Sequence, residues 1–212
     1  MYVLHFYPGN ASMAPHMMLR HGHLAHRLEL VDRDSNAQKS PAYLKLNPNG
    51  RIPTFQDGDT VLYEAAAICL YLSEKHPELG LAPTAGSALR PEFLKWLIWA
   101  TNTLQPELLT YHYTERHCSD PSEVPGVKAK SVERLAGMYG QLDQVLSDGR
   151  PYFLGQDISL LDFYLLMLGR WGRMLDVPPR DYPHLGPYLT RLTDHPTVAE
   201  TMETEGLKRP WI

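Results

Sequence analysis

The sequence has only two cysteines among its 212 residues, Cys69 and Cys118, and they form no C-x-x-C motif. This scarcity excludes a disulfide framework and a zinc-thiolate site, and it is typical of a protein in a reducing compartment. Basic residues are not in excess either, because 24 acidic residues against 20 basic ones give a formal net charge of −4. The chain offers no basic field for a polyanion, so we expect no nucleic-acid partner.

Long apolar runs are also absent. The first residues, M-Y-V-L-H-F-Y-P-G, contain no charged n-region, and no later stretch approaches the length of a membrane span. We therefore expect a cytoplasmic protein without a membrane partner. The length allows one large domain or two small ones, and either can bury a hydrophobic core.

Residues 44–72 are the densest part of the sequence in structural signals. N-P-N-G at 47–50 predicts a sharp turn, because proline fixes its own φ and glycine tolerates a positive one. D-G at 57–58 predicts a hairpin between strands at 51–55 and 60–63.

A helix follows this hairpin. From Glu64 onward, Ala65, Ile68, Cys69 and Leu72 recur at i, i+3, i+4 and i+7, the spacing of a helix that lays one face on a core. Glu64 and the free N–H groups of the helix should therefore meet at one strand-to-helix junction.

The chain before this stretch predicts alternating strands and helices. A short apolar strand at 2–6 ends at Pro8-Gly9, Ser12 opens a helix, a second strand covers 26–31, and 40–46 forms a short helix or turn. Together with residues 44–72 the order is β-α-β-α-β-β-α, in which the first two strands are parallel. The sequence thus predicts a thioredoxin-like α/β domain over residues 1–77.

The rest of the chain predicts helices only. Residues 78–90 are rich in proline and glycine and are expected to form a linker, followed by an all-helical domain over 91–212. Apolar residues at helical spacing over 93–104 predict its first helix, with a kink at Pro106. The same spacing over 135–145 predicts another helix. Ser159 and Asp162 form an expected capping box before an apolar helix that should be the buried centre of this domain.

Two features of residues 44–72 suggest a binding site. The helix N-terminus can hold a carboxylate while Glu64 pairs with a cationic amine. Pro53 cannot donate to a sheet ladder, so Ile52 can pair its backbone with an extended peptide; the bond between them is a candidate for the cis isomer. The alternative reading is a hairpin that simply packs on a helix.

The run N-P-N-G-R-I-P-T-F followed by Y-E-A-A-A-I-C-L-Y-L resembles the glutathione-binding half of the cytosolic glutathione transferases. In that family a cis-proline presents the backbone of the preceding residue to the cysteine of glutathione, which implies this role for Ile52 and Pro53. The resemblance makes Glu64 the anchor of the γ-glutamyl end. Ala65 stands where the family usually has serine, so a hydroxyl is lost but the backbone N–H remains.

The resemblance places the catalytic donor in the first strand–helix loop, F-Y-P-G-N-A-S-M, which is similar to that of the bacterial beta class. That class usually has a cysteine and then a serine; here Ala11 and Ser12 stand instead, which excludes a mixed disulfide at Ala11. We expect Ser12 to donate a hydrogen bond to the glutathione thiolate. Asn10 is a candidate to share this contact, and Tyr7 is the rival donor. The alternatives are that Ser12 is a plain N-cap and that Tyr7 only packs against its neighbours.

Further residues follow from the same resemblance. Arg51, and after it Lys39, are candidates for the carboxylates of glutathione, although such cations are often merely solvated. A second-substrate pocket is expected along the first helix of the helical domain, formed by aromatic and polar side chains that can also be core: Trp99, Gln105, Tyr111, His112 and Tyr113. The beta class tends to have a histidine at the position of Gln105.

The resemblance implies a homodimeric, detoxifying glutathione transferase that conjugates glutathione, as co-substrate and without a further cofactor, to small electrophilic, mostly apolar substrates. The alternatives are a non-catalytic glutathione-binding, stress-response or assembly protein, and a glutathione-dependent isomerase or dehalogenase. We expect no metal site: the histidines between His21 and His26 do not have the spacing of a known zinc site.

Overall fold

The computed structural model describes residues 1–212 and divides into two compact units. The first consists of Met1–Thr84 with Thr193–Trp211, and the second of Ala85–Leu192 with Ile212. The sequence prediction assigned residues 193–211 to the second domain. They belong to the first unit because α9, Pro196–Thr204, packs on α1, Met13–His21.

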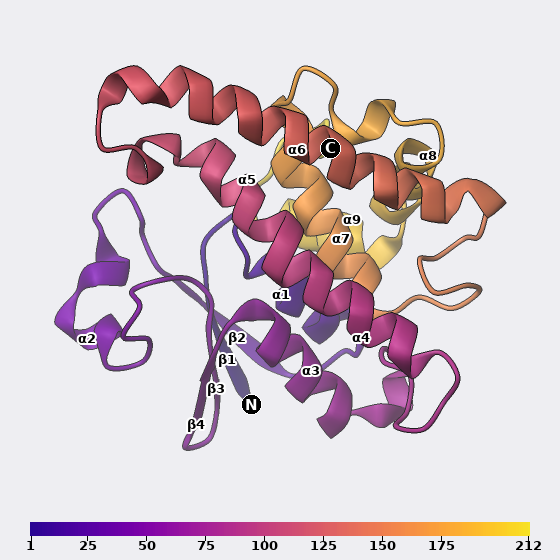
Figure 1. The fold of residues 1–212 in the computed structure, drawn as a ribbon. Helices are drawn as coiled ribbons and strands as arrows, with labels where there is room; N and C mark the ends of the chain where they lie inside the picture. Colours follow the sequence, from indigo (N-terminus) through magenta and orange to yellow (C-terminus); the bar gives the residue numbers. More distant parts are fainter. The chain divides into compact units, whose positions relative to one another are not determined.

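The first unit is built on a four-stranded sheet of order β2-β1-β3-β4 (Figure 1). β1 (Tyr2–Phe6) pairs in parallel with β2 (His26–Leu30) and antiparallel with β3 (Thr54–Asp57), which pairs antiparallel with β4 (Thr60–Tyr63). The helices of this unit are α1, α2 (Pro41–Leu44), α3 (Ala65–Lys75) and α9. This order confirms the predicted thioredoxin-like arrangement.

The hairpin differs in detail from its prediction. Because Pro53 has no N–H to donate to a ladder, β3 begins only at Thr54. Asp57 pairs with Thr60, so the two turn residues are Gly58 and Asp59, and Gly58 has a φ of +57°. The turn is therefore centred one residue later than the D-G pair indicates.

The two faces of the sheet are covered by different elements. Leu4 and Phe55, which pair across β1 and β3, are fully buried together with Ile68 and Leu72 of α3. Since neighbouring side chains on a strand point to opposite faces, His5 points away from this core, and its ring contacts that of Tyr43 on α2.

Tyr43 belongs to a small second cluster with Val31 and Ile52, against which Tyr7 packs. The loop after β1 therefore lies beside the turn that precedes β3.

The second unit consists of helices. They are α4 (Arg90–Trp99), α5 (Gln105–His112), α6 (Val124–Val145), α7 (Leu160–Trp171) and α8 (Leu185–Thr193). The predicted capping box is confirmed, because Ser159 and Asp162 each accept from the other's backbone. Every residue of α7 except Trp171 is buried, as expected for a helix that is apolar all round.

The break in the first helix of this unit lies before the predicted position. Ala100–Leu104 forms a single π-helical segment between α4 and α5, and Pro106 occupies the first turn of α5. Proline has no N–H for the carbonyl one turn earlier, so the irregular hydrogen bonding falls in the residues that precede it.

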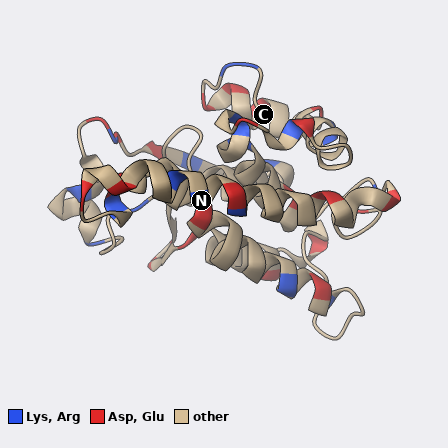
Figure 2. Ribbon diagram, turned by 45° about the horizontal axis from the view of Figure 1, so that its top comes forward, with Lys and Arg blue, Asp and Glu red and all other residues tan.

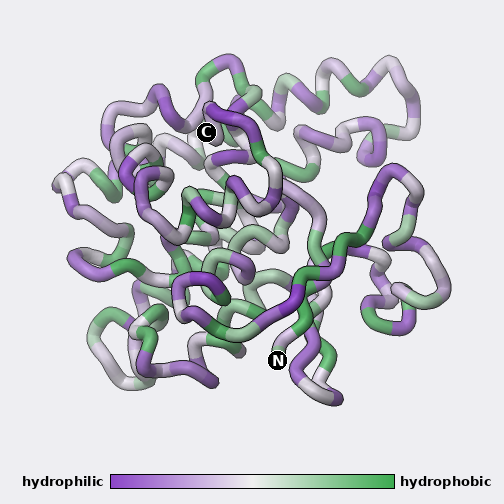
Figure 3. The backbone as a smooth tube through the Cα atoms, turned by 180° about the vertical axis from the view of Figure 1, so that it is seen from behind, coloured by the Kyte–Doolittle hydropathy of each residue, from purple (hydrophilic) through white to green (hydrophobic).

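Charged residues are spread over the helices, whereas apolar residues are concentrated in buried elements such as α7. Figure 2 shows Lys and Arg interspersed with Asp and Glu on the helices. Figure 3 shows hydrophobic residues in short runs, and no helix combines the length and the hydropathy that a membrane crossing requires.

Candidate functional site

Ser12 is fully buried at the end of the loop between β1 and α1. Its Oγ accepts the N–H of Tyr7 at 3.3 Å and donates to the carbonyl oxygen of Tyr7 at 3.2 Å, so the hydroxyl closes the loop onto the end of β1. It makes no capping hydrogen bond to α1. Ser12 thus occupies the N-cap position of α1, but its hydroxyl proton is shared with the carbonyl group of Tyr7.

In the same loop, the side chains of Asn10 and Tyr7 each have a hydrogen-bond donor without a partner. Asn10 Oδ1 accepts the N–H of Ala11 at 2.7 Å, which leaves the Nδ2 group of Asn10 unbonded. The Tyr7 hydroxyl has no hydrogen bond, while its ring lies 5.4 Å from the Arg33 guanidinium. Two free donors thus accompany the hydroxyl of Ser12 within residues 7–12.

The loop is held by a residue near the other end of the chain. Glu205, whose side chain is fully buried, accepts the N–H of Gly9 through Oε2 at 2.8 Å and Nδ1–H of His16 through Oε1 at 2.8 Å. A carboxylate that accepts from a buried ring nitrogen and from a partly buried N–H fixes both the loop and the first turns of α1. Nothing in the sequence indicates this role, because 196 residues separate Glu205 from Gly9.

The turn at residues 47–50 is tied to the start of β3. The carbonyl of Arg51 accepts from Tyr43 Oη at 2.9 Å and from Asn47 Nδ2 at 2.8 Å. The next peptide bond, Ile52–Pro53, is cis. Ile52 is almost fully buried, yet neither its N–H nor its carbonyl forms a hydrogen bond. The backbone of Ile52 can therefore pair with a bound peptide.

Glu64 has an unusual backbone. Its φ is +70° with a ψ of 113°, a region that costs a non-glycine residue on the order of 1–3 kcal/mol. The side chain is exposed and has no hydrogen bond or ion pair. α3 starts directly after it, with the N–H groups of residues 65–67 free, and Ile68 is the first to bond back to the Glu64 carbonyl. The junction thus presents an unpaired carboxylate beside free donors.

The two candidate cations differ in their surroundings. Arg51 is exposed and has no ion pair. Lys39 Nζ donates to the carbonyl of Asn49 at 3.2 Å and lies against Gly50, whose φ is +57°. Lys39 is therefore engaged in the turn, whereas Arg51 is free to meet a ligand carboxylate.

The residues expected in a second-substrate pocket fall into separate environments. The rings of Trp99 and Trp96 pack edge to face at 5.2 Å, and Gln105 Oε1 accepts from the buried Tyr164. The ring of Tyr113 lies 4.2 Å from the Arg116 guanidinium. These contacts within the helical unit do not gather the three side chains around a common cavity.

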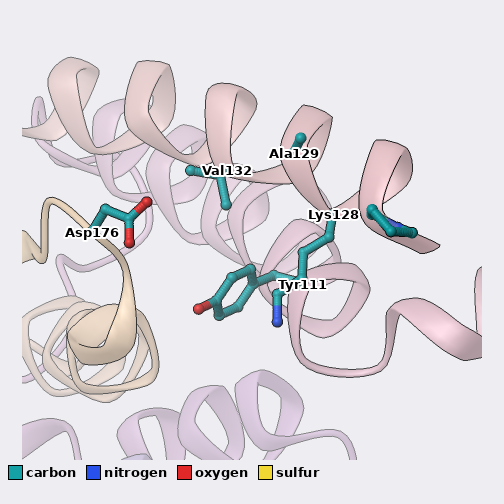
Figure 4. Close-up of a pocket in the computed structure, with 6 residues that line it drawn as sticks. Tyr111, Lys128, Ala129, Val132 and Asp176 are labelled. Atoms are coloured by element: carbon teal, nitrogen blue, oxygen red, sulfur yellow. The ribbon is translucent and has the colours of Figure 1, made fainter.

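Tyr111 and His112 instead contact the segment after α7. Tyr111 Oη donates to the carbonyl of Met174 at 3.2 Å, and His112 Nε2 donates to that of Trp171 at 2.9 Å. Only Tyr111 of the five predicted residues lines the described pocket, which has a volume of about 340 Å³. Its other lining residues were not predicted: Pro125, Lys128, Ala129, Val132 and Asp176 (Figure 4).

The histidines are not arranged as metal ligands. No group of three or more His, Cys, Asp or Glu side chains is placed to hold a metal ion. His16 and His26 pack edge to face at 5.8 Å, and His21 and His195 lie 5.7 Å apart. Burial lowers the pKa of His21, His26 and His195, so these rings favour the neutral form.

Comparison with known proteins identifies the protein family to which this fold, with its β4–α3 junction, belongs. The family model of the glutathione S-transferase N-terminal domain matches residues 11–75, and that of the C-terminal domain matches residues 109–196. The GST-like protein YncG of Escherichia coli is 30% identical over 78% of this chain and 79% of its own length. The chain belongs to the glutathione S-transferase family, and its enzyme class is that of a glutathione transferase.

Solved structures place it near the bacterial enzymes. A Sulfitobacter glutathione transferase homologue with bound glutathione is 26% identical, covers 98% of this chain and 99% of its own, and has a TM-score of 0.87. A beta-class transferase of Sphingomonas chungbukensis is also 26% identical, covers 97% of this chain and all of its own, and has a TM-score of 0.83. The predicted likeness to the beta class is confirmed.

Proposed function

We propose that this protein binds glutathione at the junction of β4 and α3 and transfers it to small electrophilic, mostly apolar acceptors. The observation that carries the proposal is the exposed and unpaired carboxylate of Glu64, held at a φ of +70° beside the free N–H groups of α3. An amine and a carboxylate on one carbon, as in the γ-glutamyl group, match this pair of features. The bound glutathione of the Sulfitobacter homologue supports the assignment.

The rest of the peptide is assigned to neighbouring groups. The free backbone of Ile52 pairs with the cysteine of glutathione, and Pro53 follows it at the start of the strand. Arg51 meets a terminal carboxylate, with Lys39 in a secondary position. Ala65 contributes its backbone N–H, because it has no hydroxyl to offer.

Thiol activation is assigned to the loop of residues 7–12. The thiol of glutathione loses its proton to solvent, and the resulting thiolate is stabilised by donors at the start of α1. Ser12 supplies its hydroxyl by turning away from the Tyr7 carbonyl, and Asn10 Nδ2 shares the contact. The thiolate sulfur then attacks the acceptor carbon, a C–S bond forms, and a leaving group such as halide departs with the bonding electrons.

Binding and activation are tested separately. Glu64→Gln should weaken glutathione binding about tenfold, because a charged partner of an amine is lost, whereas Asp59→Asn in the hairpin turn should leave it unchanged. Calorimetric titration measures both variants. Equal affinities for the two would remove the role of Glu64.

Ser12→Ala should raise the pKa of the bound thiol, which ultraviolet difference absorbance of the thiolate follows. Asn10→Ala and Tyr7→Phe, measured in the same way, rank the other two donors. An unchanged thiol pKa in Ser12→Ala would transfer the role to whichever of the other variants shows the rise.

A second candidate function is a glutathione-binding protein without turnover. It is favoured by Ala11 and Ala65, which lack the family's side-chain groups, and by Gln105, which is bonded to Tyr164. Retention on immobilised glutathione combined with an aryl halide conjugation assay separates the two functions. Retention without turnover across several electrophiles supports the binder, and loss of retention contradicts both.

We also propose a homodimer in the cytoplasm. On α4, Leu94 and Ile98 lie one turn apart with exposed fractions of 38% and 52%, an apolar stripe suited to a second copy. Cys69 and Cys118 are both free thiols, which suits a reducing compartment.

A further inference from the structure

The helical unit contains a pocket that is separate from the residues assigned to glutathione. Tyr111 of α5 lies on one side of it, successive turns of α6 form the other side, and Asp176 of the segment after α7 lies at its edge (Figure 4). Its volume is about 340 Å³ and most of its lining residues are exposed, so it is an open hollow that suits a small ligand.

The pocket carries two opposite charges that do not neutralise each other. Lys128 and Asp176 both line it, both are exposed, and neither forms an ion pair or a hydrogen bond. Figure 4 shows them on opposite sides of the Tyr111 ring, with Lys128 Nζ 4.9 Å from the ring centroid. A ligand can therefore satisfy both charges only if its own two charged groups are separated.

Apolar side chains line the space between these charges. Pro125, Ala129 and Val132 form the wall along α6, opposite the Tyr111 ring. The hydrogen bond from Tyr111 Oη to the Met174 carbonyl sets the orientation of that ring. Apolar surface between two separated charges matches a flat hydrocarbon body that carries a polar group at each end.

We propose that this pocket binds a small zwitterion whose carboxylate and amine flank an apolar, preferably aromatic, body. The carboxylate lies at Lys128, the amine lies at Asp176, and the body lies against Tyr111 and Val132. The site does not depend on the glutathione chemistry proposed above.

His112, the neighbour of Tyr111, provides a second readout for the same site. Its pKa is lowered, first by desolvation and further by the charges of Arg173 and Lys128. A carboxylate bound at Lys128 offsets that positive charge and should raise the pKa of His112.

Four ligands with one body test the proposal: 4-(aminomethyl)benzoate, which has both charges, 4-methylbenzoate, 4-methylbenzylamine and p-xylene. NMR titration of the 212-residue chain gives each affinity. We expect the zwitterion to bind about threefold to fivefold more tightly than either singly charged ligand, the range for partly exposed ion pairs. The shifted signals should come from α5, α6 and the segment after α7, and the pKa of His112 should rise.

Variants assign each charge to its residue. Lys128→Gln should remove the zwitterion's advantage over the benzylamine, and Asp176→Asn should remove its advantage over the methylbenzoate. Lys130→Gln, on the same helix but paired with Glu133, should change neither. Equal affinities of the four ligands, equal effects of Lys128→Gln and Lys130→Gln, or shifts confined to other elements would overturn the proposal. Glutathione affinity, measured in parallel, reports on the proposed function alone.

Discussion

The buried contact between Glu205 and the β1–α1 loop predicts a large loss of stability when it is broken. Glu205→Ala removes the acceptor of two donors, the partly buried N–H of Gly9 and the buried Nδ1–H of His16. A buried donor left without a partner, such as Nδ1–H of His16, costs about 1–3 kcal/mol, and the partly buried N–H of Gly9 adds less, so the variant should lose about 2–4 kcal/mol of its free energy of unfolding. This loss is a large part of the free energy of unfolding of a typical protein, which is about 5–15 kcal/mol.

Glu205→Gln should cost less. Its amide oxygen still accepts from one donor, but its amide nitrogen meets the other donor, and we expect a loss of about 1–3 kcal/mol. Glu203→Ala is the matched control, because Glu203 is exposed two residues earlier and has no ion pair. Its effect should stay within about 0.5 kcal/mol.

Urea unfolding followed by circular dichroism ranks the variants, and amide hydrogen exchange locates the effect. Protection should fall first in α1 and in the loop that contains Gly9, and only later in α7 of the other unit. If Glu205→Ala loses no more stability than Glu203→Ala, or if exchange rises equally in α1 and α7, the buried carboxylate does not hold the loop and the reasoning is refuted.

Three further predictions concern pH, assembly and the turn. Burial lowers the pKa of His21, His26 and His195 below 6.5, so the unfolded state binds more protons than the folded state. The free energy of unfolding should therefore rise with pH in the range below about 6.5. His195→Asn should reduce this pH dependence, as measured by urea unfolding at several pH values. Ile98→Arg should convert the proposed dimer to a monomer, which light scattering after size exclusion detects as a halved mass. Gly50→Ala should destabilise the protein by about 1–2 kcal/mol in thermal unfolding, because φ is +57° and a Cβ would lie 2.7–2.9 Å from neighbouring atoms; an unchanged midpoint would contradict the strain.

Local sequence signals predicted much of the fold. The capping box of Ser159 and Asp162 joins residues three apart, and the turn at 47–50 depends on its own proline and glycine. The helical periodicity after Glu64 likewise predicted α3. Such signals succeed because the interacting groups are neighbours along the chain and need no tertiary context.

Details of the same elements depended on packing. The sequence placed a kink at Pro106, yet the irregular turn covers Ala100–Leu104, since proline affects the hydrogen bonds of the residues before it. Ser12 looked like either a cap or a catalyst, and only the structure bonds its hydroxyl to Tyr7. Which of several available partners a side chain takes is set by the backbone around it.

The sequence by itself determined the thioredoxin-like order, the helical second half, and the position of Glu64 at the start of a helix. Only the tertiary structure brought Glu205 to Gly9 and His16, and Asp176 to Tyr111 and Lys128. The physical reason is distance along the chain: capping, turns and periodicity act within a few residues, whereas these contacts form only after whole helices have packed.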